Sequence, residues 1–352
     1  MKESNPFVSV IVPCYMERRF ISQFLDSVLS QDYPKDSLEV IIADGNSTDG
    51  TREVILRCID KTKFIKLIDN PLKNQTIALN KACRISRGEI IVRLDVHANY
   101  PVDYISSLVS AQQRLHAWNV GCPWVTMPSD NTAESFVIAS VLSSPFGVGN
   151  ALYRIGTKKE KLVDTVPFGC FPKDVLVKLD YYNEQFLKNE DDELNARIVK
   201  AGGTIYLLQY PVVTYFARET NLKLFKMLFQ YGYYKPFVNY SVGSIISLRQ
   251  LFPPAFVVYC CIIPSLLLFD ILYPIIIFFL IPFIIYLLLL LIFSFKTAFG
   301  LNHKFKKTAV FFLAIISFAG MHFSYGFGYI RGFINLLLGA KSKSQKLENI
   351  TR

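Results

Sequence analysis

The sequence predicts an α/β domain with a parallel sheet, followed by apolar helices that lie in a membrane. In the N-terminal part of the chain, short apolar runs alternate with amphipathic helical segments, as they do around a parallel sheet. Further along, Asp270 is the one charged residue among the 46 that separate Arg249 from Lys296. Because about 20 apolar residues span a bilayer, this stretch has room for two crossings.

The charges of the chain are unevenly distributed. The 352 residues carry a formal net charge of +10 and are 51% hydrophobic. Residues 1–250 contribute a net charge of +3, whereas residues 251–352 contribute +7. The excess of lysine and arginine therefore lies in the most apolar part, where basic residues flank membrane segments. This distribution argues against nucleic-acid binding, and the apolar content excludes a disordered chain.

Four buried strands and three helices are predicted before residue 95. Continuous apolar runs indicate buried parallel strands, and apolar residues on one helical face indicate amphipathic helices. The expected strands cover residues 8–12, 38–43, 64–69 and 89–94, and the expected helices cover residues 19–31, 51–61 and 76–87. Ligands bind at the carboxyl ends of such strands, which here are residues 13–17, 44–49 and 95–97.

The membrane part is predicted from three apolar segments. These are residues 252–269, 273–295 and 308–330. The loop 296–307 carries four lysines, so we expect it, and with it the N-terminal 250 residues, on the cytoplasmic side. Glycines and His322 interrupt the third segment. Two topologies stay open: a third crossing that leaves the basic tail outside, and a segment that re-enters the bilayer or lies at its surface.

Asp44 ends the second predicted strand, before a loop of small and polar residues. A carboxylate there can accept a hydrogen bond from the N3–H of a bound uracil. Aspartates also cap helices and fix turns, and Asp49, just before the helix that begins at Thr51, fits that role well. Asp44 fits it less well because it lies directly at the strand end, so both roles stay open for this residue.

Asp95 and His97 follow the fourth predicted strand at positions i and i+2. Two ligands at this spacing can meet one divalent cation on a nucleotide diphosphate. Oxygen ligands suit Mg²⁺ or Mn²⁺, and an imidazole shifts the preference towards Mn²⁺. Aspartate at a strand end is also common without any metal.

Residues 190–193, Glu-Asp-Asp-Glu, open a predicted helix that stops at Gly202 and Gly203. Acidic residues in the first turn stabilise a helix through its dipole. The alternative is catalytic, because neighbouring carboxylates repel one another and can raise one pKa towards the range of a general base.

In order and spacing, these segments resemble glycosyltransferase family 2, whose members have the GT-A fold. The resemblance covers residues 7–215 and rests on segments 8–17, 43–51, 93–97 and 190–197. A closer similarity is to the membrane-anchored transferases of succinoglycan and other exopolysaccharide biosynthesis. It rests on the apolar C-terminal third and on segments 143–150, 163–169 and 230–232.

The resemblance implies transfer of a sugar from a nucleotide diphosphate donor, with inversion at the anomeric carbon. It implies that Pro13, Tyr15 and Glu17 line the nucleotide pocket, together with Asp44 and Asp95. The sequence has no Gln-x-x-Arg-Trp motif after the acidic cluster, which argues against a processive polymerase.

The resemblance also implies a metal site and a base. Asp95 and His97 stand at the family's Asp-x-Asp motif, where they would hold a divalent cation, Mn²⁺ or Mg²⁺. Asp191 matches the family's catalytic base, which would deprotonate an acceptor hydroxyl. Glu190 and Arg197 would support that base within the same charged cluster.

We expect the chain to have four parts. These are a GT-A domain at residues 1–217, an interfacial segment at 218–250, a membrane domain at 251–340 and a basic tail at 341–352. The interfacial segment is predicted from apolar residues on one face of residues 222–231, with Lys223 and Lys226 beside them. An ordinary packed surface helix is the alternative.

The leading hypothesis is a multi-pass hexosyltransferase of the inner or plasma membrane with a cytoplasmic catalytic domain. It would move a sugar from a UDP-sugar to a lipid-linked saccharide in exopolysaccharide or cell-surface glycan synthesis. One alternative is a polyprenyl-phosphate sugar synthase, whose acceptor is already ionised and needs no base at Asp191. The other is a nucleotide-sensing membrane scaffold or transporter, although two or three crossings are few for a transporter.

Overall fold

The computed structural model describes residues 5–266, 273–301 and 305–340, and these divide into two compact units. The first, here called the sheet unit, consists of Met1–Val125 and Leu152–Tyr215. The second, the helical unit, consists of Thr126–Ala151 and Phe216–Arg352. A segment from the middle of the N-terminal half therefore belongs with the C-terminal helices. The four-part division predicted above has no such excursion, and its boundaries stay a prediction.

The sheet unit is built on an eight-stranded sheet with the order β3-β2-β1-β4-β9-β6-β10-β8. Its strands are β1 Val8–Cys14, β2 Leu38–Asp44, β3 Ile65–Asp69, β4 Ile90–Arg93, β6 Asn119–Gly121, β8 Lys161–Leu162, β9 Cys170–Pro172 and β10 Ile205–Leu207. The four strands predicted from the sequence form its parallel half, in which Val8 pairs with Leu38 and Cys14 with Asp44. The sheet as a whole is mixed, because β9 runs antiparallel to both β4 and β6.

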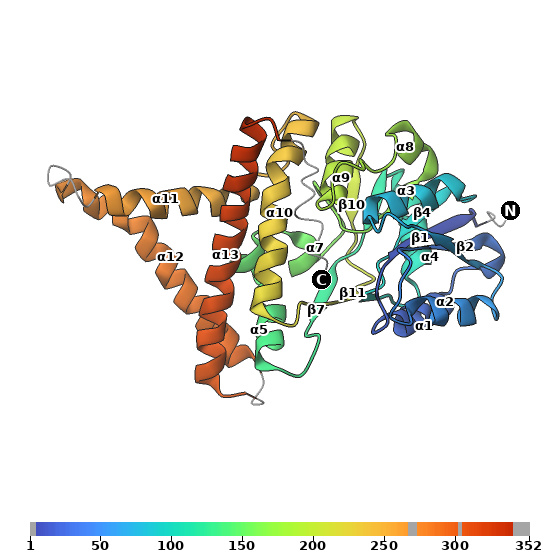
Figure 1. Cartoon of the computed structure of the whole chain (residues 1–352), viewed down its shortest axis with the longest axis horizontal. Coiled ribbons are helices and arrows are strands. Elements are labelled where there is room, and N and C mark those ends of the chain that lie inside the picture. Colours follow the sequence, from blue (N-terminus) through green and yellow to red (C-terminus); the bar gives the residue numbers. More distant parts are fainter. Residues whose placement is uncertain (1–4, 267–272, 302–304, 341–352) are drawn as a thin grey trace. The chain divides into compact units, whose positions relative to one another are not determined.

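Helices cover both faces of this sheet (Figure 1). They are α1 Ile21–Leu29, α2 Thr51–Ile59, α3 Gln75–Ile85, α4 Tyr104–Leu115, α7 Leu152–Ile155, α8 Lys173–Lys178 and α9 Glu190–Lys200, with a 3₁₀ turn η1 Lys35–Ser37. Alternate residues of β1 face opposite cores: Val10 packs with the core under α1, α2 and α4, whereas Ile11 packs with the core under α3, α8 and α9. Two-sided burial explains why these strands are continuous apolar runs.

A smaller sheet has the order β5-β11-β7. Its strands are β5 Ala98–Asn99, β7 Trp124–Met127 and β11 Val213–Phe216. The chain passes between the two units within β7 and β11. In the sheet unit, the rings of Trp124 and Tyr215 stack with centroids 4.6 Å apart.

A fully buried carboxylate, Glu39 of β2, ties the amino-terminal ends of the strands together. It accepts hydrogen bonds from Ser9 Oγ at 2.6 Å, Lys66 Nζ at 2.9 Å and the backbone N–H of Arg87 at 2.6 Å. Burial alone would raise the pKa of Glu39, but these partners outweigh it and lower the pKa to about 2. The ionised form is therefore the one that the fold stabilises.

We expect Glu39→Gln to lower the stability of the protein at pH 7 by on the order of 2 kcal/mol, because hydrogen bonds to a charged group are lost. Since the pKa of Glu39 is lower in the folded chain, the wild-type advantage is present above about pH 4.5 and is lost as the pH falls towards 2. Thermal unfolding in detergent between pH 7 and pH 3 measures this. The exposed Glu53→Gln serves as control, and a gap that does not narrow at low pH contradicts the assignment.

The helical unit consists of α-helices and one short 3₁₀ turn in its described part. These are α5 Ala133–Leu142, α6 Pro145–Val148, α10 Asn221–Val242, η2 Leu248–Leu251, α11 Phe252–Leu266, α12 Tyr273–Gly300 and α13 Lys307–Leu337. Within the described residues, two stretches are long and apolar enough to cross a membrane, Leu280–Gly300 and Lys307–Leu337. They overlap the second and third predicted segments and extend past the predicted ends at residues 295 and 330. The first predicted segment begins with α11, but its last residues, the turn at Asp270 and the tail 341–352 lie outside the described residues.

A seam of glycines brings α10 and α13 together side by side (Figure 1). A Cβ on Gly328 would lie 2.1 Å from the carbonyl oxygen of Phe229, and one on Gly332 would lie 2.0 Å from that of Tyr233. In the opposite direction, a Cβ on Gly232 of α10 would lie 2.2 Å from the carbonyl oxygen of Tyr325. Small residues four apart allow such backbone contact between apolar helices.

We expect Gly332→Ala to push α10 and α13 apart at a cost on the order of 1–3 kcal/mol, because the added methyl meets backbone that cannot turn away. Scanning calorimetry of the full chain in detergent should show a lower Tm. Gly300→Ala is the matched control, since a Cβ at this helical glycine meets nothing within 4 Å. Equal transition temperatures for the two variants contradict the seam.

The amphipathic residues 222–231 of the predicted interfacial segment, 218–250, form the first half of α10. Leu224 and Met227 of this helix are buried in the helical unit, whereas Leu222, Lys223 and Lys226 are exposed. One face is therefore that of a packed helix, and the other is the basic, amphipathic face that the sequence predicted. Whether that face meets a membrane stays a prediction.

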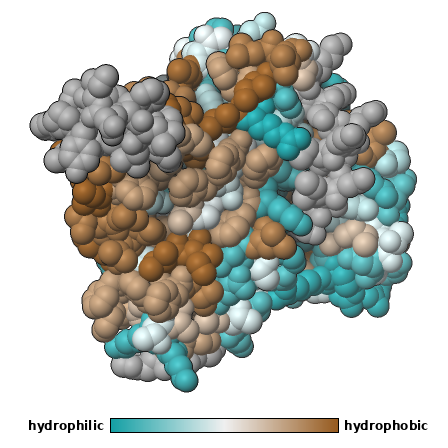
Figure 2. Space-filling view, turned by 60° about the vertical axis from the view of Figure 1, so that its left-hand side comes forward, coloured by the Kyte–Doolittle hydropathy of each residue, from teal (hydrophilic) through white to brown (hydrophobic). Residues whose placement is uncertain are grey.

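Apolar side chains are exposed over a broad area of the helical unit (Figure 2). On α12 they include Ile284, Ile285, Leu288, Ile292 and Phe295, each at least half exposed. At 3.6 residues per turn these five lie within an arc of about 100°, so they form one apolar face of α12. Isolated exposed apolar residues are ordinary, but a contiguous area marks an interaction surface.

Candidate active site

The carboxyl ends of β1, β2 and β4 meet at one edge of the sheet, and the predicted site residues follow them. Their alignment is fixed by the parallel pairing of β1 with both neighbours. Tyr15 and Glu17 follow β1, Asp44 ends β2, and Asp95 follows β4. The arrangement agrees with the expectation that ligands bind at this edge.

Asp44 is fully buried and fixes the loop that follows β2. It accepts hydrogen bonds from Ser47 Oγ at 2.6 Å and from the Ser47 backbone N–H at 3.0 Å. Arg52 lies 3.2 Å from Asp44 and also pairs with Asp69, at 2.7 Å. Asp44 therefore has a turn-fixing role in the structure, although its place at the strand end fits that role less well. Its contact with a base stays a prediction.

The residues after β1 lie against the same loop. Gly45 allows this, because a Cβ at that position would come within 2.7 Å of the Tyr15 ring. Lys73 Nζ lies 5.2 Å from the centre of that ring. Glu17 is buried, and its backbone N–H donates to Thr51 Oγ1 at 2.9 Å. Pro13, inside β1, is partly exposed.

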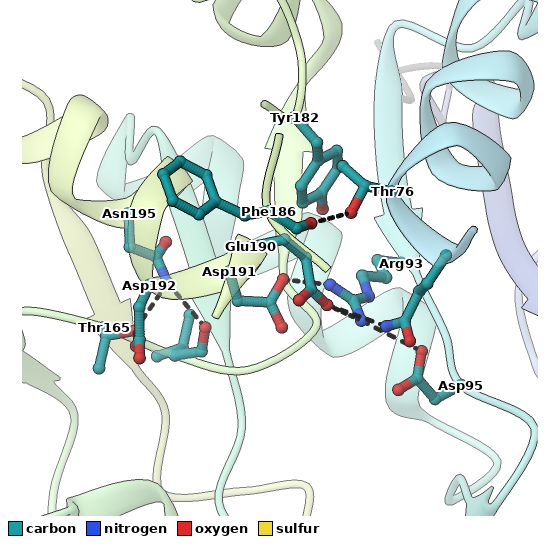
Figure 3. Close-up of polar contacts among 12 residues, drawn as sticks. Thr76, Arg93, Asp95, Thr165, Tyr182, Phe186, Glu190, Asp191, Asp192 and Asn195 are labelled. Carbon is teal, nitrogen blue, oxygen red and sulfur yellow. Dashed lines mark hydrogen bonds and ion pairs between the residues drawn. The ribbon is translucent and has the colours of Figure 1, made fainter. Parts of the chain in front are cut away.

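A buried arginine, Arg93 at the end of β4, gathers three carboxylates (Figure 3). Its Nη1 contacts Asp191, and its Nη2 lies 3.0 Å from Glu190 and 3.4 Å from Asp95. Gln75 donates a second hydrogen bond to Glu190, at 2.9 Å. Asp191 and Asp95, which are 96 positions apart in sequence, thus belong to one cluster.

Helix α9 presents its acidic first turn to this cluster. Asp192 does not join it but accepts a hydrogen bond from Thr165 Oγ1 at 2.9 Å. Asn195, one turn further, donates to Thr165 Oγ1 and to the carbonyl of Val166. These contacts fix the orientation of α9, so that Glu190 and Asp191 face Arg93.

Arg197, predicted to support the base, lies outside the cluster. It pairs with Glu193 at 2.7 Å and donates to the carbonyls of Leu179 and Tyr181. Arg197 is nearly two turns along α9 from Asp191, about 9 Å at 1.5 Å per residue, which explains its separation. Its contacts are those of a residue that fixes the end of α8.

Comparison with known proteins identifies the family. Residues 9–169 match the model described as Glycosyl transferase family 2. These residues are therefore a family 2 glycosyltransferase segment, and the chain is a glycosyltransferase. Its enzyme class is that of the glycosyltransferases, EC 2.4, and its donors are nucleotide sugars.

Named relatives extend the match beyond that segment. A Methanococcus voltae protein named dolichyl N-acetyl-alpha-D-glucosaminyl phosphate 3-beta-D-2,3-diacetamido-2,3-dideoxy-beta-D-glucuronosyltransferase is 25% identical over 64% of this chain and 72% of its own. The succinoglycan biosynthesis protein ExoA of Rhizobium meliloti is 28% identical over 70% of this chain and 74% of its own.

A solved structure confirms the GT-A fold of this glycosyltransferase. It is the mannosyltransferase PcManGT of Pyrobaculum calidifontis, in complex with GDP-Man and Mn²⁺. The two chains are 21% identical, with a TM-score of 0.55, over 89% of this chain and 87% of the other.

The carboxylates of the glycosyltransferase site differ in exposure and in proton affinity. The side chain of Asp191 is 20% exposed, against 8% for Glu190, so Asp191 is the one open to a substrate. Burial raises the pKa of Asp191 well above its ordinary range; Arg93 opposes this shift, and the charges of Glu190 and Asp95 add to it. A carboxylate with a raised pKa is suited to accept a proton.

The residues present fit a divalent cation only with help from a ligand. Among the described residues, no group of three or more His, Cys, Asp and Glu side chains could hold a metal ion. Asp95 is buried, with 12% of its side chain exposed, whereas His97 is partly exposed and its ring packs on Tyr215 with centroids 5.5 Å apart. Mg²⁺ and Mn²⁺ accept few protein ligands when phosphate oxygens complete the coordination, so this pair fits a cation that arrives with a diphosphate.

Two members of the cluster, Arg93 and Gln75, were not predicted from the sequence. Arg93 could have been identified, because it is a charged residue in an apolar strand and lies two positions before a site aspartate. A buried charge of this kind needs a partner. Gln75 could not have been identified in this way, because its approach to Glu190 depends on how α3 and α9 pack on one face of the sheet.

Proposed function

We propose that this glycosyltransferase moves a sugar from a UDP-sugar to a lipid-linked saccharide, with inversion at the anomeric carbon. The observation that carries the proposal is the approach of Asp191, on α9, to Asp95, on the β4 end, through their common partner Arg93. A base and a metal ligand so arranged can act on the two sides of one sugar.

In the proposed reaction, Asp191 accepts the proton of an acceptor hydroxyl. The acceptor oxygen forms a bond to the anomeric carbon while the bond from that carbon to the diphosphate breaks, which inverts the configuration. Asp95 and His97 would hold Mn²⁺ or Mg²⁺, which offsets charge on the leaving diphosphate when bound. Tyr15, with Pro13, Glu17 and Asp44 in the loops around it, would bind the nucleotide.

A lipid-linked acceptor is supported by the relatives and by the apolar helices. The name of the Methanococcus voltae relative gives its acceptor as a dolichyl phosphate-linked sugar. Here, two helices are long and apolar enough to cross a membrane, and the exposed face of α10 carries lysines. We propose that they hold the enzyme in the inner or plasma membrane, with the active site on the cytoplasmic side.

The proposal is tested with the purified full chain in detergent. UDP-sugars and GDP-sugars are screened as donors against a polyprenyl-diphosphate-linked sugar, polyprenyl phosphate and a water-soluble sugar. We expect transfer from a UDP-sugar to the lipid-linked sugar, with an inverted anomeric configuration by NMR. Transfer to polyprenyl phosphate alone would instead identify a polyprenyl-phosphate sugar synthase, and nucleotide binding without transfer would identify a sensing protein.

A further inference from the structure

Arg93 is the most buried residue of the cluster that it forms with Glu190, Asp191 and Asp95. Its side chain is 2% exposed, and its guanidinium lies 5.8 Å from the centre of the Tyr182 ring. Burying a guanidinium is costly unless charged partners compensate. Its Nε has no hydrogen-bond partner among the described residues, and the hydrogen bonds of the side chain go to carboxylates through Nη1 and Nη2.

The two terminal nitrogens of Arg93 bond different carboxylates. Nη1 donates to Asp191, whereas Nη2 donates both to Glu190, at 3.0 Å, and to Asp95, at 3.4 Å. Because the guanidinium is planar and rigid, the direction of one contact constrains the other. A shift of Asp95 therefore changes the direction in which Asp191 is held.

The charges of this cluster do not balance. With all three carboxylates ionised, a single guanidinium leaves two negative charges uncompensated. Gln75 donates a neutral hydrogen bond and does not change this sum. A divalent cation at Asp95 would compensate this excess of negative charge. Binding of a cation beside Asp95 and the position of Asp191 are therefore linked through Arg93.

We propose that Arg93 is a positioning residue that links the metal ligand Asp95 to the base Asp191. The inference rests on the proposed function, which gives those two aspartates their roles. Arg93 itself touches neither substrate nor cation. It holds Asp191 in the direction of attack, and it holds Asp95 where a cation that arrives with the donor diphosphate can reach it.

The test is Arg93→Lys in the full chain in detergent. Lysine keeps the charge but cannot contact Asp191 and Asp95 with two fixed nitrogens. We expect the Mn²⁺ concentration for half-maximal UDP binding, measured by calorimetry, to rise about 10-fold or more. We also expect kcat to fall about 100-fold, because small misplacements of a catalytic group have effects of this size, while the acceptor KM stays within about threefold.

Arg84→Lys is the matched control. Arg84 also lies over a tyrosine ring, 5.6 Å from the centre of Tyr181, but it is exposed and outside the cluster. We expect its Mn²⁺ midpoint and kcat to equal those of the wild type. Should Arg93→Lys fail to fold, the double variant Arg93→Gln with Glu190→Gln removes one charge of each sign and is expected to show the same two changes.

The outcomes separate this inference from the function on which it rests. An unchanged Mn²⁺ midpoint together with a kcat within threefold of wild type overturns the positioning role and leaves the transferase function intact. A lower Tm with an unchanged midpoint overturns it too, since a purely structural role predicts that result. A shifted midpoint in a protein that transfers no sugar supports the link through Arg93 and contradicts the proposed function.

Discussion

Asp191→Asn is expected to fold, to bind nucleotide and to lose sugar transfer. Removal of a general base lowers kcat by on the order of 10²–10⁴-fold, and the amide oxygen of asparagine can still accept the hydrogen bond from Arg93. Donor turnover is followed by release of the nucleoside diphosphate, and nucleotide binding by calorimetry. Asp192→Asn is the matched control. Asp192 is the next carboxylate along α9, but it accepts a hydrogen bond from Thr165 and does not join the cluster.

The same assignment predicts a pH dependence. Asp191 must be ionised to accept a proton, and its pKa is raised by burial. Activity should therefore fall as the pH drops through that raised pKa, at a pH well above the ordinary value of about 3.9 for aspartate.

Wild-type turnover by an Asp191→Asn enzyme would rule out the base and favour an acceptor that is already ionised.

Asp95→Asn is expected to abolish the metal dependence of nucleotide binding. The amide keeps the shape of the side chain and an acceptor for Arg93 but loses the charge that a divalent cation needs. Because even indirect partners of a metal change its affinity 10–100-fold, we expect the apparent Kd for UDP in the presence of Mn²⁺ to rise at least about 100-fold. Calorimetry with and without Mn²⁺ measures this.

The control for Asp95→Asn is Asp69→Asn. Asp69 also ends a strand and also pairs with an arginine, Arg52, but its side chain is 64% exposed. Its replacement should leave the effect of Mn²⁺ on UDP binding unchanged. If Asp95→Asn binds UDP as the wild type does, with the same response to Mn²⁺, Asp95 is not a metal ligand.

The parallel half of the sheet was predictable because burial on both faces leaves a mark in the sequence. β1 and β2 are continuous apolar runs, and their observed ends differ from the predicted ones by at most two residues. The strands β6, β9 and β10 have three residues each. Strands so short have no periodicity to detect, and their pairing depends on the sheet that is already present.

The candidate site was predictable in its acids but not in their grouping. Asp95 and Asp191 were identified from position and resemblance, and the structure brings both to Arg93. Sequence distance gave no sign that an arginine of β4 would join them. Arg197 was expected in the cluster from the resemblance, but helix geometry directs it to the carbonyls at the end of α8.

The excursion of Thr126–Ala151 into the helical unit has a consequence for biosynthesis. Its helix α5 buries Val137, Ile138 and Val141 in the same core as Leu224 of α10 and Phe318 of α13. Helix α5 ends at Leu142, whereas α10 begins at Asn221 and α13 only at Lys307. The nascent chain therefore carries an incompletely covered apolar helix until α13 has been made, so this core is completed late in translation.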